Sequence, residues 1–167
     1  MSLATVDSNN QPSVRMVLLK EFDQDGFKFY TNLESEKSEE IKHNPKVALC
    51  LYWETLHRQI RIRGKATLLA RDKVDTYFSS RPIGAQISAT VSKQSRELKS
   101  YAELEKACEE LKAKLGDKKL PTPEHWGGYI VEASDIEFWQ GAKNRLHDRV
   151  LYTKTSKGLW QSTRLNP

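Results

Sequence analysis

The segment of residues 58–69 alternates polar and apolar side chains, and this alternation limits the folds that the chain can adopt. Successive side chains of a β-strand point to opposite faces, so Ile60 and Ile62 would point one way and Arg61 and Arg63 the other. The segment therefore predicts a strand with one apolar and one polar face.

Other segments also have the length and composition of strands, and turn sequences rich in Asn, Asp and Gly separate several of them. Residues 46–53 are almost continuously apolar, which predicts a central, buried strand. The predicted strands are residues 1–7, 13–22, 27–32, 46–53, 58–69, 126–134, 136–153 and 159–165. With a few inserted helices, they predict a mainly β chain of the α+β class that forms an antiparallel barrel.

Three segments have helical character. Residues 35–45 carry acidic side chains in the first turn, and residues 71–82 end at a proline. In residues 100–116, an apolar stripe recurs at helical spacing, and Ser100 and Glu103 have the spacing of a capping box. These helices are expected between the strands.

Length and composition narrow the class of protein. A chain of 167 residues is expected to form a single domain over residues 1–167. It has no long apolar run and no basic leader, so we expect a cytoplasmic protein without a membrane partner. Cys50 and Cys108 lack metal-ligand spacing and are expected to be buried free thiols, with no metal site. The net charge of +5 allows an anionic partner, either nucleic acid or a small phosphate.

The segment of residues 138–149 concentrates hydrogen-bonding side chains beside Trp139. If it is a strand, Arg145, His147 and Arg149 share one face. Like charges on one strand face repel, which favours an anionic ligand or an acidic partner close to them. The alternative is that His147 is an ordinary surface or core histidine.

Two further segments carry cationic and hydroxyl side chains. In a strand, residues 15–20 place Arg15 on one face and Lys20 on the other, which could serve two anions. Residues 80–95 offer Arg81, hydroxyls and backbone donors that suit phosphate oxygens. The alternatives are surface charges at strand ends and a solvated polar helix.

Seven segments, taken in order along the chain, resemble one known family. They are RMVLLK (15–20), FYTN (29–32), RQIRIRG (58–64), SRPIGAQISATVSKQS (80–95), WGGY (126–129), EFWQGAKNRLHDR (137–149) and RLNP (164–167). The chain thereby resembles the pyridoxine (pyridoxamine) 5'-phosphate oxidase family over its whole length, and residues 137–149 are the most specific match.

The resemblance implies an FMN-binding split β-barrel that acts as a homodimer with two sites at the subunit interface. The implied activity is that of an FMN-dependent oxidoreductase acting on CH–NH2 groups. Such an enzyme oxidises pyridoxamine 5'-phosphate or pyridoxine 5'-phosphate to pyridoxal 5'-phosphate and reduces O2 to H2O2. Bound FMN accepts the hydride, so the protein need only bind the flavin, orient the substrate against it and neutralise the charge of the two phosphates.

The resemblance also implies the site residues, with Arg15 and Lys37 at the flavin phosphate and Lys20, Tyr77 and Arg81 at the substrate phosphate. The implied cofactor-binding residues are Arg15, Met16, Val17, Leu18, Leu19, Lys20, Tyr30, Thr31, Lys37, Gln59, Gln94, Ser95, Trp139 and Arg149. The implied substrate-binding residues are Lys20, Tyr77, Arg81, Arg145, Leu146 and His147, of which Arg145 and His147 flank the pyridine ring as catalytic residues.

Three features depart from the family pattern. Glu36 replaces a basic residue close to the expected flavin phosphate, and Ala85 replaces a serine of the substrate-phosphate site. The chain begins at the first barrel strand, so the family's N-terminal lid segment is expected to be absent. We therefore expect the flavin site to be retained and turnover to be slower or less selective.

Two alternatives come from other functional classes. One is a non-catalytic or weakly active split-barrel protein that binds FMN or pyridoxal phosphate. The other is a basic nucleic-acid-binding barrel, which is not favoured because the chain has no recognisable nucleic-acid motif. Which of the two phosphorylated substrates is preferred stays open.

Overall fold

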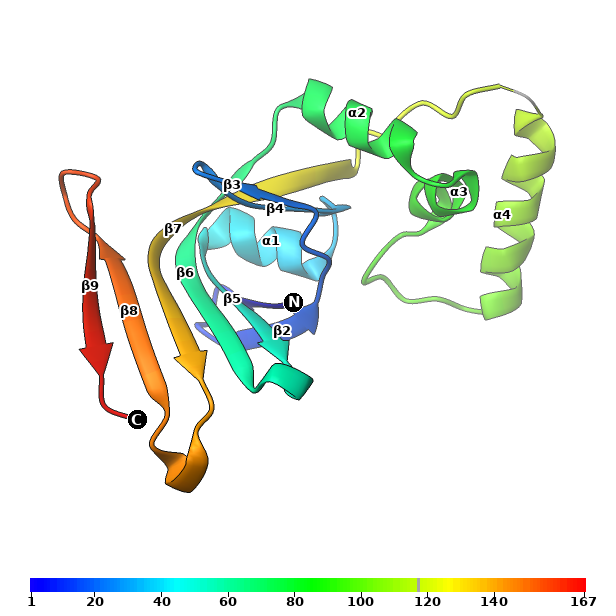
Figure 1. The fold of residues 1–167 in the computed structure, drawn as a ribbon. Coiled ribbons are helices and arrows are strands. Elements are labelled where there is room, and N and C mark those ends of the chain that lie inside the picture. Colours follow the sequence, from blue (N-terminus) through cyan, green and yellow to red (C-terminus); the bar gives the residue numbers. More distant parts are fainter. Residues whose placement is uncertain (117) are drawn as a thin grey trace. The chain divides into compact units, whose positions relative to one another are not determined.

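The structure is a computed structural model that describes residues 1–116 and 118–167 (Figure 1). The strands are β1 (Ser2–Val6), β2 (Pro12–Met16), β3 (Glu21–Asp23), β4 (Gly26–Asn32), β5 (Lys46–Trp53), β6 (Arg58–Leu68), β7 (Trp126–Gln140), β8 (Asp148–Lys154) and β9 (Trp160–Leu165). The α-helices are α1 (Glu36–His43), α2 (Arg71–Ser80), α3 (Ile83–Val91) and α4 (Tyr101–Leu115), and the short 3-10 helices are Glu54–Leu56 and Lys143–Arg145. Within the described residues, no helix is long and apolar enough to cross a membrane.

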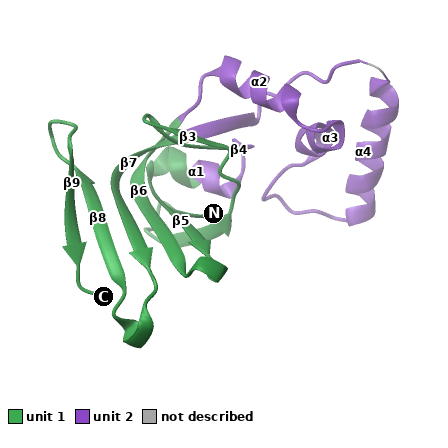
Figure 2. Ribbon diagram, viewed as in Figure 1, with its two compact units in different colours: residues 1–29, 40–67, 130–167 green, residues 30–39, 68–129 purple. Residues whose placement is uncertain are grey.

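The chain divides into two compact units, drawn in different colours in Figure 2. Unit 1 consists of residues 1–29, 40–67 and 130–167, and it contains most of the sheet. Unit 2 consists of residues 30–39 and 68–129, and it contains α2, α3 and α4. The expectation of a single domain over residues 1–167 stays a prediction.

The strands form one sheet in the order β2-β1-β5-β6-β7-β4-β3, with β8 paired to β7 and β9 paired to β8. The pairs β1–β2, β1–β5, β3–β4, β5–β6, β7–β8 and β8–β9 are all antiparallel. The main path ends at β2 and β3, so the sheet is not closed into a continuous barrel. The predicted fold class, mainly β with inserted helices, is confirmed.

The predicted central strand is β5, which lies between β1 and β6. Leu49 is paired with Leu3 on β1 and with Ile62 on β6, and all three side chains are buried. On β6, Ile62 is buried whereas Arg61 and Arg63 are exposed, as the alternating sequence predicts. The alternating sequence of β6 therefore predicts which of its side chains pack into the core of unit 1.

Two glycines allow strands of unit 1 to approach closely. A side chain at Gly64 would collide with the backbone of Glu132 on β7, and one at Gly26 would collide with the backbone of Val131. Gly26 also has a φ of 147°, which L-residues rarely adopt. Glycine is therefore required where β4 and β6 lie beside β7.

The prediction of one strand over residues 13–22 is wrong, because β2 ends at Met16 and β3 begins at Glu21. The linking residues change hydrogen-bond partners: the Val17 N–H donates to Met1 O, and the Lys20 N–H donates to Lys28 O. The chain therefore stops pairing alongside β1 and begins to pair alongside β4. Side-chain exposure still alternates through this segment.

Two other predictions need correction. Residues 126–140 form one strand, β7, and not two, whereas residues 143–145 form a 3-10 turn inside a predicted strand. Helix α4 is confirmed, but Ser100 makes no side-chain capping hydrogen bond, so the capping box is not formed. Both thiols are free, as predicted, although Cys50 and Cys108 are only half-buried.

Candidate functional site

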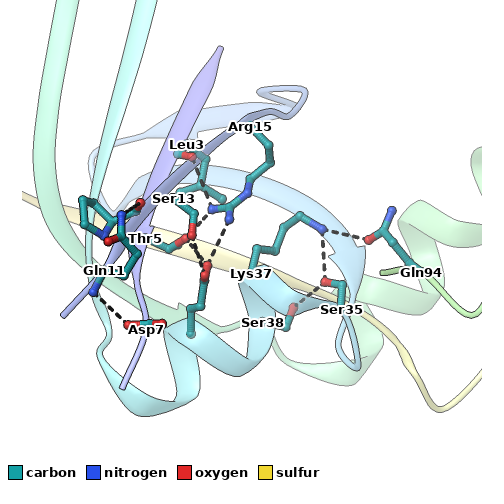
Figure 3. Close-up of polar contacts among 12 residues, drawn as sticks. Leu3, Thr5, Asp7, Gln11, Ser13, Arg15, Ser35, Lys37, Ser38 and Gln94 are labelled. Atoms are coloured by element: carbon teal, nitrogen blue, oxygen red, sulfur yellow. Dashed lines mark hydrogen bonds and ion pairs between the residues drawn. The ribbon is translucent and has the colours of Figure 1, made fainter. Parts of the chain in front are cut away.

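In unit 1, Arg15 lies at the end of edge strand β2 and is held by a buried acid (Figure 3). Its Nη2 donates to Glu40 Oε2 at 3.0 Å, and its Nη1 donates to the Thr5 hydroxyl and to Leu3 O. The side chain of Glu40 is only 6% exposed and that of Arg15 is 19% exposed. This is a largely buried ion pair that hydrogen bonds support on both sides.

Glu40 accepts two further hydrogen bonds, from the hydroxyls of Ser13 and Thr5. Burial alone would raise the pKa of Glu40. The hydroxyl donors Ser13 and Thr5 and the charge of Arg15 outweigh that effect, so the pKa lies below its ordinary value. Ser13, Thr5 and Arg15 therefore all favour the ionised form of Glu40.

In unit 2, Lys37 is buried near the start of α1. Its Nζ donates to Gln94 Oε1 at 2.8 Å and to Ser35 Oγ at 3.1 Å (Figure 3). The Thr31 hydroxyl donates to the same Gln94 oxygen. The structure thus brings together three of the sequence-predicted cofactor residues, Thr31, Lys37 and Gln94. Ser95 follows in an exposed turn with a φ of 68°.

Also in unit 2, Arg81 follows α2 and lies over aromatic rings. Its guanidinium carbon is 4.4 Å from the ring centre of Trp126 and 5.8 Å from that of Phe78. Its Nη1 is buried and has no hydrogen-bond partner among the described residues. Desolvation by burial lowers the pKa of Arg81, although the group keeps its charge. A buried cationic donor without an acceptor is a feature that an anion would satisfy.

Tyr77 on α2 stacks on Tyr30 of β4 in the same unit, with ring centres 3.8 Å apart. The sequence assigned Tyr30 to the cofactor and Tyr77 to the substrate, so residues from both predicted sets are in contact. Ala85, on α3, is half-buried, and its N–H donates to Pro82 O. Glu36, the first residue of α1, is exposed to solvent.

The linker after β2 places apolar side chains at the surface of unit 1. Met16 and Leu18 are 74% and 68% exposed, Val17 and Leu19 are half-buried, and Lys20 is exposed. Large apolar side chains at this exposure are available to a ligand or a partner.

The prediction that Arg145, His147 and Arg149 share one strand face is wrong. Asn144 and Arg145 have left-handed backbone conformations, with φ of 54° and 61°, and β8 begins only at Asp148. A strand face requires extended backbone, which these residues do not have. Arg145 and Leu146 are exposed in the turn.

His147 nevertheless lies beside Trp139, with ring centres 4.7 Å apart. The Ala142 N–H donates to His147 Nδ1, so in the neutral ring the proton is on Nε2.

Arg149 lies on β8 and is held by an acid. It donates to Glu137 at 2.9 Å and to Asn166 O at 2.9 Å, and the Glu137 hydrogen bond raises the pKa of Arg149. Gln59 on β6 is half-buried.

Sequence reasoning missed the acids that hold the arginines. Glu40 lies on the buried face of α1 beside Ile41, and Glu137 lies on the same strand face as Val131 and Ala133. Each could have been found as an acidic residue at a position where the period calls for an apolar one. Trp126, under Arg81, was noted as part of a strand and of the family-like WGGY segment, but no site role was assigned to it.

Comparison with known families gives an unambiguous result. Residues 1–115 match the family described as pyridoxamine 5'-phosphate oxidase, and residues 126–167 match the pyridoxine 5'-phosphate oxidase C-terminal dimerisation region. The chain belongs to the pyridoxamine 5'-phosphate oxidase family. The predicted family is thereby confirmed, and the matches support an oxidoreductase of a flavin-binding family with a region that mediates dimerisation.

Two relatives named pyridoxine/pyridoxamine 5'-phosphate oxidase illustrate the likeness. The protein of Mesorhizobium japonicum is 47% identical over all of this chain and 82% of its own length. The protein of Shewanella sediminis is 50% identical over all of this chain and 78% of its own length.

Two solved structures share the fold. PhzG from Burkholderia lata, in complex with tetrahydrophenazine-1-carboxylic acid, is 31% identical with a TM-score of 0.94, over 99% of this chain and 81% of its own. An FMN-binding protein from Nostoc punctiforme, related to pyridoxamine 5'-phosphate oxidase, is 18% identical with a TM-score of 0.80, over 99% of this chain and 86% of its own. The fold is therefore that of the FMN-binding split barrels.

Proposed function

We propose that this protein is an FMN-dependent oxidase that converts pyridoxamine 5'-phosphate or pyridoxine 5'-phosphate to pyridoxal 5'-phosphate and reduces O2 to H2O2. The two relatives described above, which match this chain over its whole length, are named pyridoxine/pyridoxamine 5'-phosphate oxidase. Within the structure, the observation that carries the proposal is Arg81, whose buried Nη1 has no hydrogen-bond partner in the described part of the chain. A phosphorylated substrate supplies the acceptor that this guanidinium lacks.

The residues present fit a flavin phosphate. Arg15 and Lys37 are both cationic and largely buried, which is the environment in which charge-assisted hydrogen bonds to phosphate are strongest. FMN, when bound, supplies the hydride acceptor. Arg15 and Lys37 would bind its phosphate, with Gln94, Ser95 and Thr31 in support. The proposed contacts to the rest of the flavin are Met16, Val17, Leu18, Leu19, Lys20, Tyr30, Gln59, Trp139 and Arg149.

The substrate is proposed to bind through two groups of residues. Lys20, Tyr77 and Arg81 would hold its phosphate. Arg145 would cover the pyridine face, with Leu146 beside it, and His147 Nε2–H would donate to a ring substituent. The hydrogen bond from Ala142 fixes the proton on that nitrogen in the neutral ring. These residues orient the substrate, and proximity of this kind is worth up to about 7–11 kcal/mol.

We further propose that the active form is a homodimer with sites at its interface, and that it is cytoplasmic. The matched dimerisation region, residues 126–167, carries large exposed apolar side chains on adjacent strands, including Phe138, Tyr152 and Trp160. Exposed apolar surface of this kind is typical of interfaces between subunits.

Two other functions remain in competition. The TM-score of 0.94 to PhzG favours oxidation of a reduced phenazine carboxylic acid as a second candidate. The alanine at position 85, where the family resemblance implies a serine hydroxyl, favours a weakly active protein that binds FMN or pyridoxal phosphate.

The purified protein tests these candidates directly. We expect a yellow sample whose visible flavin absorbance bleaches when pyridoxamine 5'-phosphate is added without oxygen, and H2O2 on readmission of air. Unphosphorylated pyridoxamine is the matched control and should act far more slowly. Bleaching by a tetrahydrophenazine carboxylic acid alone would favour the second candidate, and a flavin-loaded sample that neither substrate bleaches would favour the third.

A further inference from the structure

We propose that Glu40 is a positioning residue that, together with Thr5 and Ser13, fixes the guanidinium of Arg15 in the orientation that receives the cofactor phosphate. This inference rests on the proposed function, because it takes Arg15 to be a phosphate ligand. It goes further by assigning a role to a buried acid that does not itself contact the cofactor.

One edge of the Arg15 guanidinium is fully engaged within unit 1. Nη1 donates to the Thr5 hydroxyl and Nη2 donates to Glu40 Oε2. Thr5 in turn donates to the same Glu40 oxygen, and Ser13 donates to the other at 2.6 Å (Figure 3). The guanidinium, the hydroxyl and the carboxylate therefore hold one another in place.

This arrangement leaves two N–H donors of Arg15 available for a ligand. A guanidinium has a fixed, planar set of N–H groups. In the described part of the chain, the Nε–H of Arg15 and one Nη2–H have no acceptor, and these two lie on the same edge of the group. Two parallel donors on one edge are what a phosphate accepts in a bidentate pair.

The position of Arg15 on an edge strand also favours this role for Glu40. Strand β2 is an edge strand, and its neighbouring side chains Val14 and Met16 are largely exposed. A long side chain at such an edge would otherwise sample many rotamers. Holding it in one orientation before the ligand arrives removes that entropy loss from binding.

Glu40 and Lys37 are three positions apart on α1, so the same helix carries the group that holds Arg15 and a second proposed phosphate ligand.

The experiment compares FMN with riboflavin, which lacks the phosphate. Apoprotein is titrated into each flavin, and the quenching of flavin fluorescence gives the dissociation constants. For Glu40→Leu, we expect FMN affinity to fall about tenfold, because the hydrogen bond to the guanidinium is lost, while riboflavin affinity stays constant. Glu40→Gln keeps an acceptor oxygen and should retain FMN affinity to within about threefold.

The remaining variants keep the test decisive. Thr5→Val, which preserves shape, should weaken FMN binding without affecting riboflavin, even if Glu40→Leu does not fold. Glu39→Leu, at an exposed position of the same helix, is the matched control and should behave as the parent. In an Arg15→Met background, Glu40→Leu should cause no further loss of FMN affinity.

Several results would overturn the inference. They are equal losses for FMN and riboflavin, parental FMN affinity in both Glu40→Leu and Thr5→Val, or an additive effect of Glu40→Leu in the Arg15→Met background. A parent protein that binds neither flavin would instead overturn the proposed function, so the two failures are distinguishable.

Discussion

Arg15 in unit 1 and Arg81 in unit 2 are both partly buried arginines, but their surroundings differ in kind. Arg15 is paired with the buried carboxylate of Glu40, whereas Arg81 lies over the ring of Trp126 and has a buried nitrogen without a hydrogen-bond partner among the described residues. The paired arginine is compensated before any ligand binds. The other has a buried nitrogen that a ligand would have to satisfy, so we expect its site to be the less stable of the two when empty.

This difference suggests that Arg15 and Arg81 have different roles. A resident cofactor calls for a site that is oriented in advance, which the Glu40 hydrogen bonds provide for Arg15. A substrate that enters and leaves in each turnover suits a site that is satisfied only transiently, as at Arg81. Functional sites commonly retain such local instability.

The largest expected effect is on folding, in Arg15→Met. This change leaves the buried Glu40 carboxylate without its cation, and the free energy of unfolding of the apoprotein should fall by on the order of 3 kcal/mol. Urea denaturation measures the loss. Replacing both partners, as Arg15→Met with Glu40→Leu, should recover most of this loss. If Arg15→Met alone is as stable as the parent, the proposed difference between Arg15 and Arg81 is wrong.

The next largest effect is on catalysis, in Arg81→Met. The free energy of unfolding should stay within about 1 kcal/mol of the parent, because the lost ring interaction is offset by removal of an unsatisfied buried donor. For pyridoxamine 5'-phosphate, kcat/KM should fall about a hundredfold through loss of a charge-assisted phosphate contact. The rate with unphosphorylated pyridoxamine serves as the internal control and should not change. A loss of stability as large as that of Arg15→Met would contradict the contrast.

A smaller effect concerns acid stability. Because the folded-state pKa of Glu40 lies below its ordinary value, the ionised carboxylate stabilises the fold above that value, and this contribution is lost as pH falls through the folded pKa. The stability difference between the parent and Glu40→Gln should therefore shrink as the pH falls through and below the ordinary titration range of a glutamate. The difference between the parent and Arg81→Met should not vary over this range, since a guanidinium does not titrate there. Chemical denaturation at several pH values checks both statements.

The smallest effect is expected for Ala85→Ser. A hydroxyl at this half-buried position of α3 would add a hydrogen bond to the substrate phosphate worth about 0.5–1.5 kcal/mol, so KM for pyridoxamine 5'-phosphate should fall a few-fold. FMN affinity should stay constant, which separates the two phosphate sites. Steady-state kinetics and flavin titration of the same preparation provide both readouts.

The sequence predicted those parts of the fold that depend on local period. The alternation around Ile62 corresponds to the observed burial, and the apolar stripe of α4 is half-buried whereas the rest of that helix is exposed. It failed where the backbone leaves its regular path: the left-handed residues Asn144 and Arg145 break a predicted strand, and the chain changes partners after Met16. Neither event leaves a pattern in the side chains.

The sequence likewise predicted only part of the candidate site. Resemblance to the family named the cations, and the structure brings Thr31, Lys37 and Gln94 together as a cluster in unit 2. The helical period could have singled out Glu40 as an acid on an apolar face, but not its pairing with Arg15, which joins a strand to a helix distant in sequence. Contacts of this kind depend on tertiary packing, which periodicity does not encode.

The central claim is that Arg15 serves the cofactor phosphate and Arg81 serves the substrate phosphate. The most direct test is to titrate Arg81→Met, reconstituted with FMN, with pyridoxal 5'-phosphate, and to record the visible spectrum. We predict parental FMN content and an affinity for pyridoxal 5'-phosphate about a hundredfold weaker. Loss of FMN with parental affinity for pyridoxal 5'-phosphate would contradict the claim.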